Sequence, residues 1–374
     1  MVITILIFII ILGVLVFVHE FGHFIVAKKS GMQVDEFGFG FPPRLVGIQR
    51  VNGKWKWVLG RKAKNEVGNL NEATIYSINT IPLGGFVKIR GENNENQDDP
   101  RSFINKGFWP RFFTLVAGVA MNWLLAAFIF SSILMLGTLS EIGPDMPAGA
   151  KITNRQVAVS EVLEKSPAQT AGLLSGDFIV SVDGNSYERY EDLKNYIYAN
   201  KGKAFEFKIQ RIDEIKTFKV QSLSNPTQDQ GPTGISLTDI AKVSLPPVTA
   251  VRAGFNQAYT VTGMIFDQLG SLFTGRQGFK QVGGPVKIAK IVGQVRHLGI
   301  VPLLNLTALL SLSLAVLNIM PFPALDGGRV LFLFIEKLRR KRNNQKVEQA
   351  FNALGFIFLL LLMLVVTAND IFGK

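Results

Sequence analysis

Two of the three histidines in the sequence, His19 and His23, lie four residues apart, and Glu20 follows the first of them. On an α-helix, residues i and i+4 share one face, so both imidazoles can bind a single metal ion. The Glu20 carboxylate can then reach a water molecule at the metal without itself binding the metal. Zinc held by two histidines and a carboxylate keeps a position open for water and lowers the pKa of that water to about 7. The spacing therefore predicts a zinc site, with Glu20 as the general base of peptide hydrolysis.

The surroundings of this motif argue against a chance match. Residues 1–27 form a nearly unbroken apolar run, which exceeds the roughly 20 residues that a helix needs to cross a bilayer. Three ionisable groups in such a run are costly and are by default functional. A secretory signal peptide is the alternative, but the run has neither a basic N-terminal region nor a small-residue cleavage site. We therefore expect the metal site inside the first membrane-spanning helix.

The composition supports a membrane protein. Of the 374 residues, 48% are hydrophobic and 18% are charged, and the mean hydropathy is +0.26, so apolar and charged segments must be segregated. The chain has no cysteine, so a metal must be bound by His, Asp, Glu or Asn, and the redox compartment cannot be inferred. The net charge of +12 has its densest cluster at Lys337 to Lys346, between two apolar runs. This is typical of a cytoplasmic anchor and argues against nucleic-acid binding.

A third metal ligand has to come from another segment, and Asp326 is the best candidate. Pro321 and Pro323 break the helix before it, and Gly327-Gly328 adds backbone freedom after it. Irregular backbone at membrane depth is tolerated only when it is buried in protein or faces a wet cavity. The alternative is a kinked helix whose restart is capped by Asp326. Capping alone does not explain why the only acidic residue of the third apolar run stands there.

Two asparagines lie in apolar surroundings, and the sequence allows two roles for each of them. Asn318, in the third apolar run, can hydrogen-bond a substrate carbonyl or oxyanion, or it can make a structural hydrogen bond. Asn122, in the second apolar run, allows the same two interpretations.

The succession of apolar and polar segments predicts an α-helical polytopic membrane protein with about four transmembrane helices, a membrane-associated β-structure and an inserted α+β domain. In chain order we expect a first span at 1–27, a loop with membrane-associated strands at 28–107, a second span at 108–139, a compact domain at 152–238, a linker with an amphipathic interfacial helix at 239–300, a third span at 301–335, a basic loop at 336–349 and a fourth span at 350–370.

Local patterns predict strands and helices outside the spans. In the loop, Trp55–Leu59 and Ile75–Arg90 are β-favouring, and a polar, acidic loop follows at 93–100. In the compact domain we expect strands at 156–163 and 178–182, a short helix within 166–173, an amphipathic helix at 191–199, and a hairpin of 205–210 with 217–221.

Charge predicts the orientation. Residues 28–107 carry thirteen Lys and Arg, residues 336–346 carry six, and the extreme N-terminus carries none. The positive-inside rule therefore places these two segments in the cytoplasm, and it places both termini and the compact domain outside. We expect a multi-pass protein of the inner (plasma) membrane, with the active site towards the cytoplasmic side.

The combination of His19-Glu-Phe-Gly-His23 with Asn318-x-x-Pro-x-Pro-x-Leu-Asp-Gly-Gly328 resembles the bacterial site-2 proteases, and within them the RseP/RasP-type zinc metalloproteases of regulated intramembrane proteolysis. The resemblance covers nearly the whole chain and includes the segments 37–44, 81–88, 91–92 and 282–286. It implies Zn2+ bound by His19, His23 and Asp326, with Glu20 as the base. It also implies that Asn318 acts near the substrate backbone or oxyanion, and that the strand at 75–90 pairs with an unwound substrate.

The sequence departs from the family at one place. The family usually has Gly-Pro shortly before the asparagine of the second span, whereas this chain has Gly118-Val119 before Asn122. The departure puts the local geometry of that helix in question, but not the catalytic residues.

The compact domain resembles a single PDZ domain, through Val162 to Leu173, Gly176-Asp177 and Val182-Asp183-Gly184. Its peptide groove is expected between the strand at 157–162 and the helix at 191–199. A size filter that excludes large ectodomains and a docking platform are equally compatible with the sequence.

These features predict an intramembrane zinc endopeptidase that cleaves pre-trimmed single-pass transmembrane segments. In the family, such substrates include anti-sigma factors and remnant signal peptides. A metal-dependent transporter or channel is the rival hypothesis, but it would need polar residues along several spans, whereas here they gather at one site. Intact Glu20 and Asp326 argue against an inactive scaffold.

Overall fold

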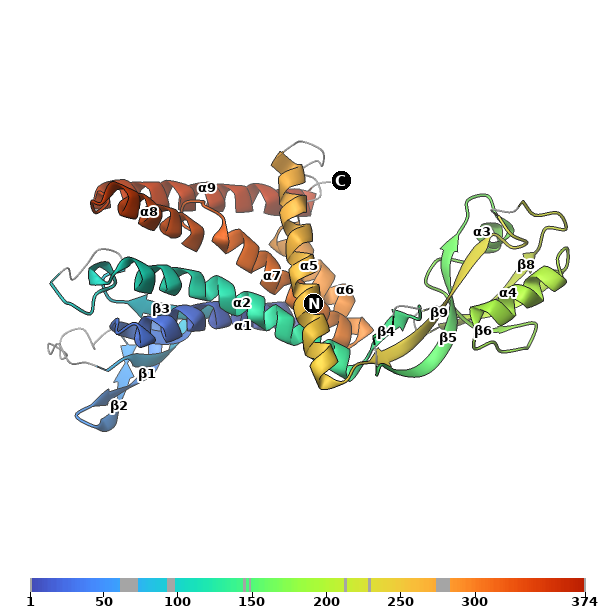
Figure 1. Ribbon diagram of the computed structural model, residues 1–374, viewed down its shortest axis with the longest axis horizontal. Coiled ribbons are helices and arrows are strands. Elements are labelled where there is room, and N and C mark those ends of the chain that lie inside the picture. The colour runs from blue at the N-terminus through green and yellow to red at the C-terminus, as the bar shows by residue number, and fades with distance from the viewer. Residues whose placement is uncertain are drawn as a thin grey trace. The chain divides into compact units, whose positions relative to one another are not determined.

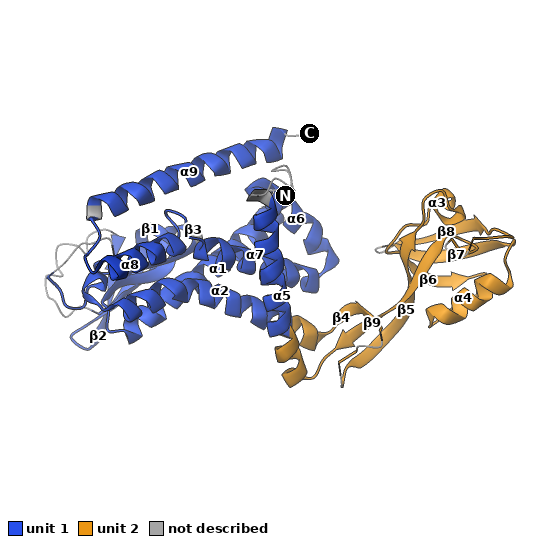
Figure 2. Ribbon diagram, turned by 45° about the horizontal axis from the view of Figure 1, so that its top comes forward, with its two compact units in different colours: residues 1–130, 254–374 blue, residues 131–253 orange. Residues whose placement is uncertain are grey.

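The structure is a computed structural model that describes residues 2–60, 73–92, 98–143, 146–147, 149–211, 214–227, 230–273 and 283–372. The chain folds into two compact units, residues 1–130 with 254–374, and residues 131–253 (Figure 2). Parts of several expected segments lie outside the described residues, among them positions 61–72 and 93–97 of the loop at 28–107, and positions 274–282 of the linker, which include Val282 of the segment 282–286.

Four of the described helices are long and apolar enough to cross a membrane (Figure 1). They are α1 (Val2–Lys29), α2 (Phe108–Leu136), α7 (Ile300–Ile319) and α9 (Gln345–Phe372). Only 6% of the most apolar window of α9 is buried, and residues such as Leu361 and Leu364 remain exposed. A helix that exposes so much apolar surface needs lipid around it, so this is an integral membrane protein.

The third apolar run, expected at 301–335 with a break at its two prolines, forms two helices. Helix α7 ends at Ile319, and a separate helix, α8 (Asp326–Arg339), follows after the two prolines. Pro321 and Pro323 cannot continue a helix, because proline has no N–H to donate and its ring clashes with the preceding turn. The basic loop expected at 336–349 is correspondingly shorter, since α8 extends to Arg339 and α9 begins at Gln345.

A three-stranded antiparallel sheet with the order β2-β1-β3 follows α1. Its strands are β1 (Val34–Val51), β2 (Lys54–Leu59) and β3 (Ile75–Ile89). Asn52 and Gly53 join the first two strands with positive φ angles, which a two-residue hairpin turn requires. The sheet shares a core with the ends of α1, α2 and α8; its buried residues are Ala27, Met32, Val34, Phe37, Ile89, Phe103, Leu115 and Leu333.

The remaining elements of the first unit lie in the C-terminal half of the chain. Helix α5 (Pro247–Phe273) lies where an interfacial helix was expected within 239–300, and it leads from the second unit into the first. Helix α6 (Pro285–Val295) and a 3-10 turn (Arg296–Leu298) precede α7. Val292 of α6 is fully buried against Ile11 and Leu15 of α1, which ties this part of the chain to the helix that carries His19 and His23.

The second unit is built on a six-stranded antiparallel sheet with the order β4-β9-β5-β6-β7-β8. Its elements are β4 (Thr138–Glu141), β5 (Lys151–Val162), α3 (Pro167–Ala171), β6 (Phe178–Val182), α4 (Tyr190–Ala199), β7 (Ala204–Arg211), β8 (Glu214–Gln221) and β9 (Ile235–Ser244). Leu193 and Ile197 of α4 pack on Phe205 and Phe207 of β7 in its core. The fold extends past the expected boundary at residue 238, because β9 pairs with both β5 and β4.

Candidate metal centre

The three expected metal ligands meet in the structure. His19 and His23 come from α1, and Asp326 is the first residue of α8. The two Nε2 atoms are 3.1 Å apart, and Oδ2 of Asp326 lies 3.0 Å from Nε2 of His19 and 3.4 Å from Nε2 of His23. Such separations match the edges of a tetrahedron whose corners lie about 2.0 Å from its centre, which is the zinc geometry.

The hydrogen bonds around the cluster fit a metal ion. Nδ1 of His23 lies 2.7 Å from the carbonyl oxygen of Thr114. A carbonyl only accepts, so Nδ1 carries the proton and the lone pair of Nε2 faces Asp326. Oδ2 of Asp326 is buried and has no hydrogen-bond donor among the described residues. A buried carboxylate oxygen without a donor is costly, and a bound cation removes that cost.

Asn122 of α2 lies beside the first ligand. Its side chain is fully buried, and its amide nitrogen is 3.5 Å from Nδ1 of His19. Its Oδ1 is buried and has no partner among the described residues, while its backbone oxygen accepts a 2.8 Å hydrogen bond from Ser311 of α7. Asn122 therefore contacts a ligand histidine from within the helix bundle, which favours a role inside the protein over contact with substrate.

Glycines let the helices approach the cluster closely. A Cβ atom on Gly118 of α2 would lie 2.4 Å from Nε2 of His23 and 2.7 Å from Nε2 of His19. A Cβ atom on Gly22 of α1 would lie 2.4 Å from the carbonyl oxygen of Ala117. Neither glycine was expected as a site residue from the sequence, although small residues are common where membrane helices touch. Helix α2 continues through Val119 without a break.

Glu20 lies next to the ligand cluster but outside it. Its carboxylate is close enough to interact electrostatically with His23 and Asp326. Strand β3 passes directly beside it, since a Cβ atom on Gly85 would lie 2.8 Å from Cα of Phe17 and 3.0 Å from Cβ of Glu20. The small sheet therefore runs against α1 at the level of the expected base.

The segment that presents Asp326 is a tight turn. A Cβ atom on Gly327 would lie 2.2 Å from the carbonyl oxygen of Met320, and one on Gly328 would lie equally close to that of Phe322. Arg329, one residue later, forms an ion pair with Glu92, which follows β3. No pattern in the sequence predicted this ion pair. It ties the end of the sheet to the helix that begins with Asp326.

Asn318 lies in the last turn of α7 and is partly exposed. Among the described residues, its side-chain amide forms no hydrogen bond. The described residues therefore contain no partner for the structural hydrogen bond that was the alternative role of Asn318.

Outside the membrane-spanning helices, a buried carboxylate organises the chain between β3 and α2. Burial raises the pKa of Asp99, but hydrogen bonds from the backbone and side chain of Arg101 and from Arg90 outweigh it and lower the pKa to about 2. Arg90 also pairs with Asp35 of β1 at 2.7 Å. These contacts hold Asp99 ionised at neutral pH and fasten the loop to the sheet.

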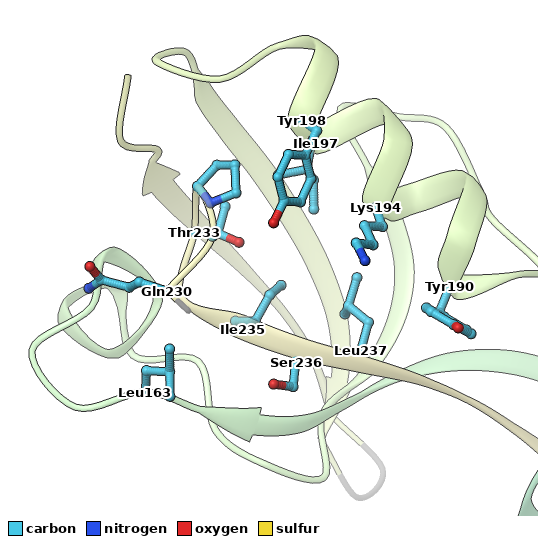
Figure 3. A pocket seen from close by; sticks show the side chains of 12 residues that line it. Leu163, Tyr190, Lys194, Ile197, Tyr198, Gln230, Thr233, Ile235, Ser236 and Leu237 are labelled. Atoms are coloured by element: carbon cyan, nitrogen blue, oxygen red, sulfur yellow. The ribbon is translucent and has the colours of Figure 1, made fainter. Parts of the chain in front are cut away.

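The second unit has a hollow of about 270 Å³ between α4 and β9, lined by Lys194, Tyr198, Ile235 and Leu237 among others (Figure 3). This corrects the expectation that a groove beside this helix is formed by the strand at 157–162. Strand β5 pairs with β9 at 156–159 and at 161–162, so β9 occupies that edge of β5. In the described chain, β4 pairs with β9 only at 240–243, which leaves one edge of Ile235–Thr238 open.

The model of a protein family described as "Peptidase family M50" matches residues 7–60 and 65–362. A putative zinc metalloprotease of Clostridium perfringens is 36% identical over 358 residues, which are 96% of this chain and 95% of the relative. The regulator of sigma-W protease RasP of Bacillus subtilis is 28% identical over 449 residues, 98% of each chain. Among solved structures, the PDZ domain of an SdrC-like protein from Listeria monocytogenes is similar, with 26% identity and a TM-score of 0.21, over 23% of this chain and 92% of that one.

Proposed function

The chain belongs to peptidase family M50 and is a zinc metalloprotease of the site-2 type, and we propose that it cleaves peptide bonds within transmembrane segments of other membrane proteins. In this proposal His19, His23 and Asp326 hold the zinc and Glu20 is the general base. The observation that carries the proposal is the convergence of three ligand atoms, two from α1 and one from the first residue of α8, beside a helix that is long and apolar enough to span a membrane.

Different residues of this chain have different roles in peptide hydrolysis. When bound, zinc supplies Lewis-acid chemistry, which acidifies a water molecule and polarises the scissile carbonyl. Glu20 takes a proton from the attacking water and passes it to the leaving amine. Asn318 donates a hydrogen bond to the substrate carbonyl as it becomes an oxyanion. Its unbonded amide at the end of α7 supports this assignment.

Asn122 orients His19. A metal-binding histidine usually donates its other ring N–H to a nearby acceptor, and this hydrogen bond selects the tautomer. The oxygen and nitrogen of an asparagine amide exchange places on a simple turn of the side chain. With Oδ1 of Asn122 turned to Nδ1 of His19, the buried oxygen would gain a donor, and Nε2 would keep its lone pair for a metal ion.

The sheet presents the substrate. A helical segment hides its peptide bonds and must be extended before it is cut. The second half of β3, from Gly85 to Ile89, pairs with β1 on one side only and forms an edge of the sheet, and Gly85 lies next to Glu20. An extended substrate that pairs with this edge as an additional strand is delivered to the base.

The substrates that this proposal names are pre-trimmed, single-pass transmembrane segments such as anti-sigma factors and remnant signal peptides. One relative is named as a regulator of sigma-W protease, which supports a regulatory substrate. The distribution of Lys and Arg supports an active site towards the cytoplasm, with both termini and residues 152–238 outside. Residues 152–238 then act as a size filter or a docking platform.

The test uses the full-length protein in detergent with a model transmembrane substrate. Glu20→Gln lowers the cleavage rate by about 10²- to 10⁴-fold, the usual contribution of a general base, and leaves the bound zinc in place. Glu188→Gln, at an exposed position of the second unit, is the matched control and keeps wild-type activity. The protease proposal fails if Glu20→Gln cleaves as fast as wild type, or if chelation of zinc leaves cleavage unchanged.

A further inference from the structure

A second site of concentrated charge lies at the far end of α8. A hollow of about 370 Å³ is bounded by the segment that leads into α2 and by the end of α8. One carboxylate, that of Glu336, lines it. Six cationic side chains line it as well: Lys106, Arg111, Lys337, Arg340, Lys341 and Arg342.

The single carboxylate is already engaged. Glu336 accepts two hydrogen bonds from Arg111, at 2.8 and 3.2 Å. Nε of Arg111 is buried and has no hydrogen-bond partner among the described residues. Within the described chain, Lys106, Arg340 and Lys341 form no ion pair. A concave surface with so many unneutralised cations concentrates anions.

The hollow lies where the chain enters the membrane. Helix α2 begins at Phe108, and its apolar span extends from there to Leu136. Trp109, in its first turn, leaves 57% of its surface exposed, as interfacial aromatic residues do. Nζ of Lys337 lies 4.0 Å from the ring centre of Phe108 and 5.0 Å from that of Trp109. These contacts hold a cation at the level where lipid headgroups meet the hydrocarbon.

We propose that this basic hollow binds the headgroup of an anionic phospholipid, whose acyl chains lie along the exposed side of α2. Basic pockets beside transmembrane helices at the membrane surface are typical sites for such headgroups. A free phosphate ion shares the charge of the headgroup. Only a lipid also accounts for the exposed Trp109 and for the start of an apolar span at the wall of the hollow. The bound lipid holds the end of the helix that starts with Asp326.

The experiment measures lipid binding to the full-length protein in detergent by native mass spectrometry. Dioleoyl phosphatidylglycerol is the anionic probe, dioleoyl phosphatidylcholine the uncharged control, and inorganic phosphate the free anion. The double variant Lys106→Gln/Lys341→Gln removes one cation from each wall of the hollow. The matched control Arg339→Gln/Lys346→Gln removes the same charge from exposed positions of the same basic segment that do not line the hollow.

We expect phosphatidylglycerol to bind more tightly than phosphatidylcholine. The hollow variant weakens phosphatidylglycerol binding about 25-fold, or about fivefold for each lysine, and the control variant changes it less than twofold. If the double variant does not fold, Lys341→Gln alone gives the fivefold loss. Equal losses in both double variants, equal binding of the two lipids, or displacement of phosphatidylglycerol by millimolar phosphate each overturn the proposal. None of these readouts depends on proteolysis.

Discussion

The two ends of α8 concentrate charge in opposite ways. At its first residue, Asp326 joins two histidines in a largely buried cluster of three atoms that lie 3.0 to 3.4 Å apart. At its other end, six cationic side chains line an open hollow. In the first case the position of each atom decides whether a metal binds. In the second case the sum of the charges decides whether an anion is attracted.

The difference follows from burial. A charge removed from water is stable only with a partner or a metal at close range, so the loss of one buried group leaves the others unsatisfied. Exposed charges are screened by salt and replace one another. Substitutions at the metal cluster should therefore have large individual effects that salt does not change, whereas those in the basic hollow should have small effects that salt weakens.

The largest effect on metal binding is expected from Asp326→Asn. It removes a ligand charge from the cluster, and zinc affinity should fall by more than 100-fold, since even the loss of a residue that only supports a ligand typically lowers affinity 10- to 100-fold. Zinc is measured by competition with a chelating dye on the purified protein. Asp267→Asn, at an exposed position of α5, serves as the control. One full equivalent of tightly bound zinc in Asp326→Asn would remove this residue from the ligand set.

Gly118→Ala tests how closely α2 packs against His19 and His23. The new Cβ atom lies 2.4 Å from Nε2 of His23, so the histidines must move and zinc affinity should fall at least tenfold. Alanine favours a helix by about 1 kcal/mol over glycine, so the helix itself is not weakened. The control is Gly263→Ala in α5, where no atom lies within 4 Å of the added Cβ. Equal zinc affinities in the two variants contradict a tightly enclosed cluster.

Asn122→Leu should lower zinc affinity 10- to 100-fold, because Nδ1 of His19 loses its hydrogen-bond partner. Asn122→Asp keeps an acceptor of the same shape and should restore most of the affinity. The absorption spectrum of the cobalt-loaded protein reports the ligand geometry directly. A purely structural role for Asn122 predicts an unchanged cobalt spectrum in Asn122→Leu, and the same loss of stability in both variants.

The smallest effect is that of salt, and it bears on both ends of α8 at once. An increase from 0.1 to 1 M shortens the screening length from about 10 to about 3 Å. Binding of phosphatidylglycerol should weaken several-fold, while the zinc content stays constant. The two measurements are made on the same sample. If high salt removed zinc as readily as lipid, the contrast between a buried and an open site would be wrong.

The small sheet shows where local patterns stop being informative. The sequence predicts β2 and β3 from their β-branched and aromatic residues, but it does not predict β1. That strand contains Gly38, Gly40 and a Pro-Pro pair, which are typical of turns. Gly38 pairs on both sides with β3, at Ser77 and at Phe86, and this pairing overrides the local preference. In the sequence, Asn52-Gly53 is a typical two-residue hairpin turn, and it could have predicted that a strand precedes β2.

The hollow of the second unit also depends on pairing that local sequence patterns do not predict. The sequence predicts the strand at 157–162 and the helix at 191–199, and both form. Which strand lies open beside the helix depends on the order of the sheet, and in that order β9 comes between β4 and β5. Strand order results from long-range pairing, which no local pattern encodes.

By itself, the sequence determined the chemistry of this protein. Ionisable residues are rare in apolar runs, so His19, Glu20, His23 and Asp326 stand out without any structure. Only the tertiary structure decided the distances: that Asp326 lies 3.0 Å from His19, and that Gly118 and Asn122 complete the surroundings of the cluster. The reason is physical. A charge in lipid is costly wherever it stands, so its presence is visible in the sequence, whereas contact between residues far apart in the chain depends on how helices pack.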